Sequence, residues 1–337
     1  GRGGARRVCG AGRRRRRGFQ RHDAEPVRFI LDAREHAGRR LPAVGERHAV
    51  VCRQGWVVDV GDLRPIVHVA RAEIGVLAAR DATLTVWDGM NETTVASKED
   101  LETLALLPPA DDGGRQFASA GADGVVRAWR YADGKVQRAA AEDCSKTGPL
   151  ESLSRFENDL VVTGHDRSVR FVDCITLKET RHAVCGGDDE VLDAAFLNDG
   201  KRLALATPSE TVRIVDAHDW RTSFLSGHAD AVLAVASCDD YVASASKDRT
   251  AKIWRESSGR WDLISTLEGH VDSVGAVALG KKGDQLVCAT ASKDRTLKLW
   301  QDGQCTSSTI AHDKDINDVA LSPGCVVVAS CSSDRTA

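Results

Sequence analysis

Three histidines, each followed by a hydroxyl and then a carboxylate, are the residues of this sequence best placed to do chemistry. In the first copy His228 precedes Ser244 and Asp248, which lie in the stretch "SASKDRT". A histidine that takes the proton of a serine while an aspartate orients its ring forms a hydrolytic nucleophile. The equivalent positions, with the tryptophan that closes two of the copies, are His228, Ser244, Asp248, Trp254, His270, Thr290, Asp294, Trp300, His312, Ser330 and Asp334.

Repetition argues against this catalytic interpretation. A hydrolase needs one nucleophile, whereas this chain carries three equivalent sets and has no G-x-S-x-G turn. An aspartate in a tight turn can instead accept backbone N–H groups and a histidine N–H, while the histidine bonds the hydroxyl and the hydroxyl bonds the indole. A buried carboxylate is tolerated only with such partners. We therefore predict structural tetrads and no enzyme activity.

The elements that must position these residues recur at a regular period. Each period contains short runs of Val, Ile, Leu, Ala or Thr broken by Gly, Asp or Asn, which is typical of strands and turns. Four strands of about five residues with their loops add up to about 40 residues, so each period predicts one four-stranded antiparallel sheet. The strand-like segments end at Trp87, Trp129, Val172, Val215, Trp254 and Trp300, at intervals of 42, 43, 43, 39 and 46 residues.

Sheets of this size must stack around a common axis to cover their faces. Repeats of this length, with "GH" near the start and "W" near the end, resemble the WD-repeat family. The resemblance implies an all-β fold, a WD-repeat β-propeller with about seven four-stranded blades, the last of them truncated.

The earlier repeats depart from the family pattern. One keeps Ser119, Asp123 and Trp129 but has no histidine upstream. The next keeps Asp166 but ends in a valine, and the one after has Ser209 where the aspartate belongs. We expect these blades to be held mainly by strand packing.

The order of several unusual segments resembles one branch of the family, the tandem-propeller subunits of the UTP-B subcomplex of the small-subunit processome. These segments are "KEDLETLALLPP", "GDDEVLDAAFLNDG", "EGHVDSVGAVALG" and "AHDKDINDVALSP". The resemblance implies a non-catalytic scaffold in the nucleus and nucleolus that supports pre-ribosomal RNA processing. Its partners would be other UTP-B and processome proteins, with small nucleolar RNA and pre-rRNA as part of the assembly. Residues 46–185 would hold the last blades of a first propeller and residues 186–337 the first blades of a second.

A second class of function stays open at this point. A generic WD-repeat adaptor, such as a ubiquitin-ligase substrate receptor or a signalling scaffold, would carry the same repeats. Its partners, rather than its fold, would distinguish it.

The composition and the motifs argue against metal, nucleotide and membrane-spanning sites. The ten cysteines form no C-x-x-C pair and the ten histidines show no metal spacing beyond the tetrads, so we expect free thiols, no metal and no cofactor. The stretch "GAVALGK" lacks the hydroxyl that a phosphate-binding loop needs after its lysine, which argues against a nucleotide. No apolar run approaches a membrane-spanning length, and we expect neither a membrane partner nor a small-molecule substrate.

Charge is distributed unevenly along the chain. Residues 1–40 hold thirteen arginines and four acidic residues, while the net charge of the whole is −3, so the body is acidic. The Arg-rich segment 1–45 lacks an apolar period and is expected to be disordered, either as an RNA-associating arm or as a solvated tail. Cations also flank the tetrad aspartates, where they are either partner contacts on one rim of the ring or solvated loop charges. They are Lys247, Arg249, Lys293, Arg295 and Arg335.

Overall fold

The structure is a computed structural model. It describes short strands between residues 49 and 96, and residues 101–110, 114–143, 148–185 and 187–336 except 188 and 335. The predicted disordered segment 1–45 lies outside these residues. No helix within the described ranges is long and apolar enough to cross a membrane.

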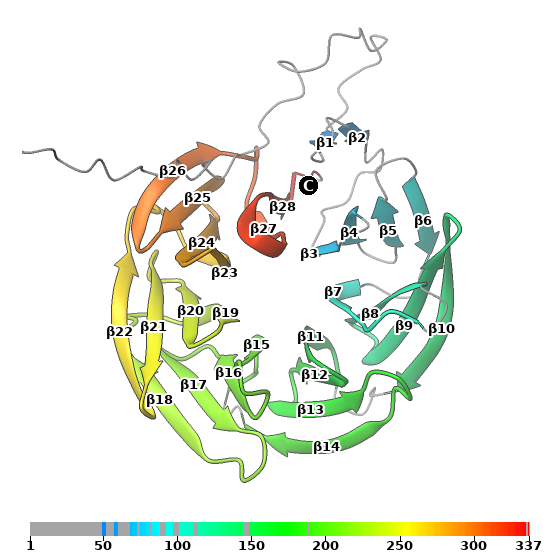
Figure 1. The fold of residues 1–337 in the computed structure, drawn as a ribbon, viewed down its shortest axis with the longest axis horizontal. Helices are drawn as coiled ribbons and strands as arrows, with labels where there is room; N and C mark the ends of the chain where they lie inside the picture. Colours follow the sequence, from blue (N-terminus) through cyan, green and yellow to red (C-terminus); the bar gives the residue numbers. More distant parts are fainter. Residues whose placement is uncertain are drawn as a thin grey trace, which may run out of the picture.

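The strands form small antiparallel sheets arranged around a central axis, as Figure 1 shows. Among the described residues, six of these sheets, or blades, have four strands. They are β3 (His68–Ala72), β4 (Gly75–Arg80), β5 (Thr83–Trp87) and β6 (Glu92–Ala96); β7 (Leu101–Leu106), β8 (Arg115–Gly121), β9 (Val125–Ala132) and β10 (Lys135–Asp143); β11 (Leu150–Phe156), β12 (Asp159–Gly164), β13 (Ser168–Asp173) and β14 (Glu179–Val184); β15 (Asp193–Phe196), β16 (Arg202–Ala206), β17 (Thr211–Asp216) and β18 (Thr222–Ser226); β19 (Val232–Cys238), β20 (Tyr241–Ser246), β21 (Ala251–Ser257) and β22 (Arg260–Leu267); and β23 (Val274–Lys282), β24 (Gln285–Ser292), β25 (Thr296–Gln301) and β26 (Gln304–Ile310).

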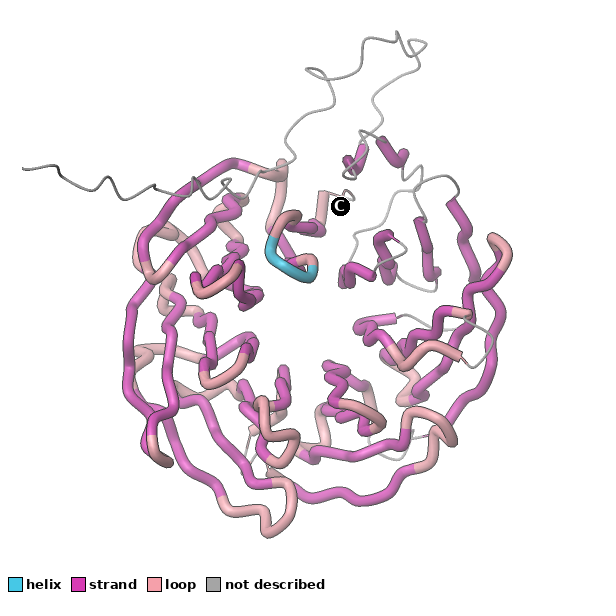
Figure 2. The backbone as a smooth tube through the Cα atoms, in the orientation of Figure 1, coloured by secondary structure: helices cyan, strands magenta, loops and turns pink. Residues whose placement is uncertain are grey.

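Two further sheets have two strands each. The pair β27 (Ile316–Leu321) and β28 (Val328–Ser332), which flanks the 3₁₀ helix η2 (Pro323–Cys325), follows β23–β26 around the ring and contacts β3. The other pair is β1 (Ala49–Val51) and β2 (Val57–Asp59). The ring of strands in Figure 2 therefore confirms the all-β propeller. The division into two tandem rings at residues 185 and 186 stays a prediction.

Burial falls from the middle of each blade to its outer edge. Strand β20 is buried over five of its six residues because neighbouring blades cover both of its faces, and small side chains such as Ala243 let those neighbours approach. The outermost strand β14 is exposed over most of its length. In Figure 1 the buried strands lie toward the centre of the ring and the exposed ones at its circumference.

The core consists of apolar layers between successive blades. Phe171 of β13 packs against Phe196 of β15, with ring centroids 6.0 Å apart, and both are buried. Leu203 and Leu205 of β16 complete that layer. The sheets on either side of the connection at residues 185–192 are thereby packed together.

A repeated bulge shapes the innermost strands. The register shifts by one residue in β7, β11, β19, β23 and β27, at the same place in each strand. Just after the bulge of β11 and of β19, a backbone N–H donates to a side chain of the preceding blade: Leu153 donates to Thr103 at 3.1 Å, and Val235 donates to Asp193 at 2.9 Å. These bonds join consecutive blades near the axis, whereas strand pairing joins strands only within a blade.

Candidate functional site

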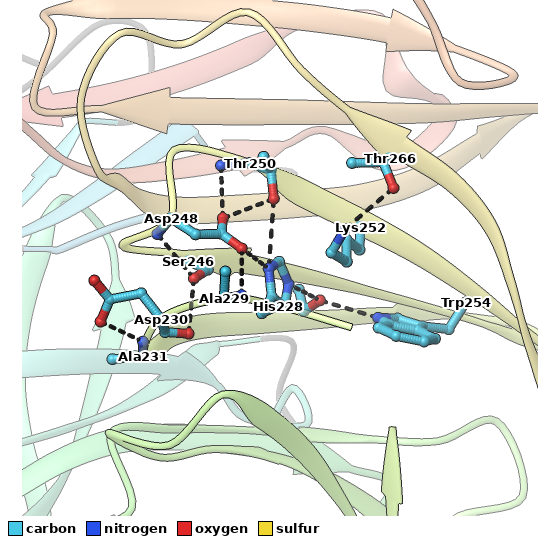
Figure 3. A network of polar contacts seen from close by, with 11 residues as sticks. His228, Ala229, Asp230, Ala231, Ser246, Asp248, Thr250, Lys252, Trp254 and Thr266 are labelled. Atoms are coloured by element: carbon cyan, nitrogen blue, oxygen red, sulfur yellow. Dashed lines mark hydrogen bonds and ion pairs between the residues drawn. The ribbon is translucent and has the colours of Figure 1, made fainter. Parts of the chain in front are cut away.

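The first tetrad occupies one end of the blade β19–β22, and Figure 3 shows it from close by. Asp248 lies in the turn between β20 and β21, and its Oδ2 atom is 2.8 Å from Nδ1 of His228. The other ring nitrogen, Nε2, is 2.8 Å from the Ser244 hydroxyl, which also accepts the indole N–H of Trp254 at 3.0 Å. The loop that carries His228 arrives from β18, so the tetrad ties one blade to the connection from its predecessor.

The direction of the hydrogen bonds follows from the chemistry of each group. An indole N–H can only donate, so the Ser244 oxygen accepts it and its own proton points to Nε2 of His228. The ring then donates from Nδ1 to the carboxylate and stays neutral. Burial lowers the pKa of His228, although Asp248 opposes that shift, which agrees with a neutral ring.

Asp248 is held ionised by several donors. Its carboxylate accepts the backbone N–H groups of Ala229 and Thr250, at 3.0 and 2.9 Å, and the Thr250 hydroxyl at 2.7 Å. Burial alone would raise the pKa of Asp248, but these hydrogen bonds and that of His228 outweigh it and lower the pKa to about 2. The carboxylate is therefore the point at which the turn, the incoming loop and the histidine meet.

The other two copies repeat this geometry. Asp294 lies 3.0 Å from Nδ1 of His270, whose Nε2 is 2.8 Å from the Thr290 hydroxyl, and the Trp300 indole donates to that hydroxyl at 2.9 Å. In the third copy the distances are 3.1 Å from His312 to Asp334 and 2.9 Å from His312 to Ser330. The structure thus brings together every tetrad residue predicted from the sequence.

A substrate cannot reach the hydroxyls of the two complete tetrads. Ser244 and Thr290 are fully buried, and each oxygen already accepts an indole N–H and bonds a histidine. A nucleophile needs open space beside it for the group that it attacks. The buried networks can hold the blades together, but they offer no site for acyl transfer.

The threonine two residues after each tetrad aspartate was not among the predicted site residues. Thr250, Thr296 and Thr336 donate their hydroxyls to Asp248, Asp294 and Asp334 at 2.7, 2.5 and 2.6 Å. The repeated "DRT" was the available signal, because a threonine hydroxyl commonly bonds a turn carboxylate. Each network therefore has five members rather than four where the tryptophan is present.

Two blades without the histidine use an arginine in its place. Asp123 pairs with Arg127, and Asp166 pairs with Arg170 at 2.8 Å, four residues along the chain in both cases. The expectation that strand packing mainly holds these blades was incomplete, because each turn carboxylate has gained a cationic partner from the following strand. The indole N–H of Trp129 still donates to Ser119 at 2.8 Å.

In the blade β15–β18 Ser209 stands in place of the turn aspartate, and the arginine of the following strand bonds another segment. Arg213 donates to the Cys185 carbonyl at 3.1 Å and lies 3.4 Å from Asp189, both in the connection from the preceding blade. Asp193 supplies a carboxylate on the innermost strand instead, accepting the Ser152 hydroxyl at 2.7 Å. Burial raises the pKa of Asp193 to about 6, despite that bond.

The predicted rim cations lie in the turns between β20 and β21 and between β24 and β25. Lys247, Arg249, Lys293 and Arg295 are exposed, whereas Arg335 lies outside the described residues. Over the ranges that the structure describes, no group of three His, Cys, Asp or Glu side chains could hold a metal ion. Gly280 and Lys281 lie within the strand β23, in extended chain rather than in a phosphate-binding loop.

Comparison with known proteins agrees with this geometry. The family model described as "WD domain, G-beta repeat" matches residues 220–255, 261–301 and 303–337, which contain the three tetrads. The chain therefore contains WD40 repeats, within a β-propeller fold.

Among individual proteins the chain is similar to transducin beta-like protein 3. The protein of Rattus norvegicus is 30% identical over 292 residues, or 77% of this chain and 36% of the relative, and that of Bos taurus is 29% identical over the same lengths. U3 small nucleolar RNA-associated protein 13 of Saccharomyces cerevisiae is 27% identical over 303 residues, 76% of this chain and 37% of the relative. The chain thus spans little more than a third of these relatives.

Replacing the first tetrad carboxylate should destabilise the fold. We expect Asp248→Ala to lower the free energy of unfolding by about 2–4 kcal/mol, because it leaves buried donors of His228 and Thr250 without an acceptor. Denaturant titration measures this loss. Asp262→Ala, at a mostly exposed side chain, is the control and should change stability by less than about 0.5 kcal/mol. Equal stability of the two variants would contradict the proposed role of Asp248.

The arginine that replaces histidine can be tested in the same way. We expect Arg170→Met to lower the free energy of unfolding by about 1–3 kcal/mol, because Asp166 loses a charged donor in a half-buried turn. Arg260→Met is the matched control, since the Arg260 side chain is 83% exposed. If the two arginine variants unfold at the same denaturant concentration, Arg170 has no such role.

Two kinds of histidine should have pKa values shifted in opposite directions. His165 lies between Glu151 and Glu190, at 2.5 and 3.0 Å, and these carboxylates raise its pKa although burial opposes them. Its stabilising effect is present below pH of about 6.5 and is lost as the pH rises through the raised value. Burial lowers the pKa of His228 and His270, so their effect is reversed and stability falls as the pH drops below about 6.5.

Ring NMR titration of the histidines measures this difference directly. We expect the midpoint of His165 above that of a model peptide and those of His228 and His270 below it. Tetrad histidines that titrate above the peptide value would show that the rings carry charge in the native state, against the hydrogen-bond directions given above.

Proposed function

We propose that this protein is a non-catalytic WD-repeat scaffold of the small-subunit processome, which supports pre-rRNA processing and small-subunit biogenesis in the nucleolus. The observation that carries the proposal is the match over about three-quarters of the chain to a yeast protein named for its association with U3 small nucleolar RNA. The buried state of the Ser244 and Thr290 hydroxyls supports the non-catalytic part.

A propeller suits a scaffold for physical reasons. Its loops sit on short strands that are fixed by packing on both faces, so partner contacts can be presented with little loss of conformational entropy on binding. The proposed partners are other UTP-B and processome proteins, with small nucleolar RNA and pre-rRNA present as part of the assembly.

The tandem arrangement belongs to the same proposal. Since the chain spans 36% of transducin beta-like protein 3 of Rattus norvegicus, the relative has room for a second ring. We propose that residues 46–185 belong to the first propeller of the full-length protein and residues 186–337 to the second. Limited proteolysis of the full-length protein tests this, since two rings would be separated by cleavage near residues 185–192 and one ring would not.

Purification of the tagged full-length protein from its own cells tests the function. We expect U3 small nucleolar RNA and processome proteins to be recovered with the wild type and with Asp262→Ala, and to be reduced with Asp248→Ala, whose fold is weakened. Depletion of the protein should lead to accumulation of unprocessed pre-rRNA. Recovery of a cullin adaptor or a signalling complex without U3 RNA would instead support a generic WD-repeat adaptor and overturn the proposal.

A further inference from the structure

Two neighbouring blades present four cations that have no partner among the residues that the structure describes. Lys247 and Arg249 lie in the β20–β21 turn, and Lys293 and Arg295 lie at the equivalent positions of the β24–β25 turn. All four are exposed, and none of their side chains makes an ion pair or hydrogen bond with any described residue. We call these four residues the cationic rim.

Both turns are held firmly. The backbone N–H of Lys247 donates to the Ala231 carbonyl at 2.9 Å, and that of Lys293 donates to the Ser273 carbonyl at 3.0 Å. A serine hydroxyl beneath each turn also bonds the incoming loop: Ser246 donates to the Asp230 carbonyl at 3.1 Å. The cations therefore project from a fixed frame, which lowers the entropic cost of binding a partner.

The turn itself does not require these cations. In the blade β7–β10 the same two positions, on either side of Asp123, are Ala122 and Gly124. In the sheet β27–β28 a serine, Ser333, takes the place of the lysine. The lysine–arginine pair is thus confined, among the described turns, to two adjacent blades.

The arginines occupy a backbone conformation that favours glycine. Arg249 and Arg295 have φ of 71° and 69°, close to the 70° of Gly124 at the equivalent position. A left-handed conformation is less favourable for a residue with a Cβ atom than for glycine, because the Cβ atom crowds the backbone. Arginine takes this position in three described turns, since Arg167, after Asp166, is also exposed and has φ of 64°. None of the three side chains has a hydrogen bond or ion pair to a described residue, which points to a role outside the molecule.

The surroundings of the cationic rim indicate the chemistry of its partner. Asp230 and Asp272 lie in the loops bonded to the two turns, since their backbone carbonyls accept the Ser246 and Ser292 hydroxyls at 3.1 Å, and they bring carboxylates to the same end of the blades as the cations. Val271, beside Asp294, is 77% exposed and adds an apolar contact. A polyphosphate of uniform charge would be repelled by these carboxylates, whereas a peptide with spaced acidic and apolar side chains would not.

We propose that the cationic rim, with Val271, is the docking surface for an acidic segment of a partner protein. The carboxylates of the segment would pair with the arginines and lysines, and an apolar residue would cover Val271. This inference does not depend on which assembly the protein joins, because it rests on unpaired cations and their backbone conformation.

The test uses the full-length protein purified with its partners. A zero-length carbodiimide joins a lysine amine to a carboxylate only where the two are in contact, and mass spectrometry identifies the linked residues. We expect links from Lys247 and Lys293 to Asp or Glu residues of one partner. Absence of such links, with the assembly otherwise intact, would overturn the proposal.

Substitution gives the second measurement. We expect Arg249→Gly with Arg295→Gly to reduce recovery of the linked partner at least about fivefold while the unfolding temperature stays the same or rises, because glycine relieves the left-handed strain. The charge-matched control, Arg221→Gln with Arg260→Gln, removes two exposed cations, one just before the outer strand β18 and one at the start of the outer strand β22, and should leave recovery unchanged. Unchanged recovery with the glycine variant would contradict the proposal. The proposal would also be contradicted if the glycine variant lost an ultraviolet cross-link to RNA while the carbodiimide links to protein were unaffected. The cationic rim would then bind nucleic acid.

Discussion

A carboxylate in the turn between the second and third strands cannot lie half-buried without donors, and the architecture of the blades that carry the tetrad histidine depends on satisfying it. Asp248 and Asp294 each collect two backbone N–H groups, a threonine hydroxyl and a histidine N–H. Because the histidine lies in the loop that leads from the preceding blade, its bond to the carboxylate also fixes where its own blade begins. The hydroxyl and indole extend this link into the core.

The same requirement is met differently where the histidine is missing. Arg127 and Arg170 reach back from the third strand to Asp123 and Asp166, which satisfies the charge within one blade. That solution binds the turn but not the incoming loop. In the blade where Ser209 replaces the turn aspartate, Arg213 instead holds the connection through the Cys185 carbonyl and Asp189. The blades therefore differ in which segment each turn restrains, although their strands pair alike.

Much of this could be predicted from the sequence, because repeats make the pattern visible. The spacing of His228, Ser244, Asp248 and Trp254 recurs, so a single blade could be assigned by comparison with its copies. The arginine partners were missed because each appears as an ordinary strand residue, and only the third dimension shows which carboxylate it reaches. The bond from Ser152 to Asp193, between blades, depends on how the sheets stack and leaves no local signal.

The fold also separates two roles within one short motif. In "SKDRT" the serine, aspartate and threonine face inward and are occupied by one another, so they are unavailable for chemistry or binding. The lysine and arginine of the same motif face solvent, and nothing in the described molecule uses them. Conformational strain at Arg249 and Arg295 thus accompanies the part of the motif that is free to meet a partner.

Hydrogen exchange of the tryptophan indole N–H groups tests the central claim most directly. If the buried network holds each blade to the preceding loop, the indoles of Trp254 and Trp300 should exchange only through global unfolding, with a free energy equal to that from denaturant titration. Trp261, half-buried on an outer strand, provides the fast reference within the same molecule. Exchange of Trp254 and Trp300 as fast as that of Trp261 would contradict the account, because the networks would then open without the fold.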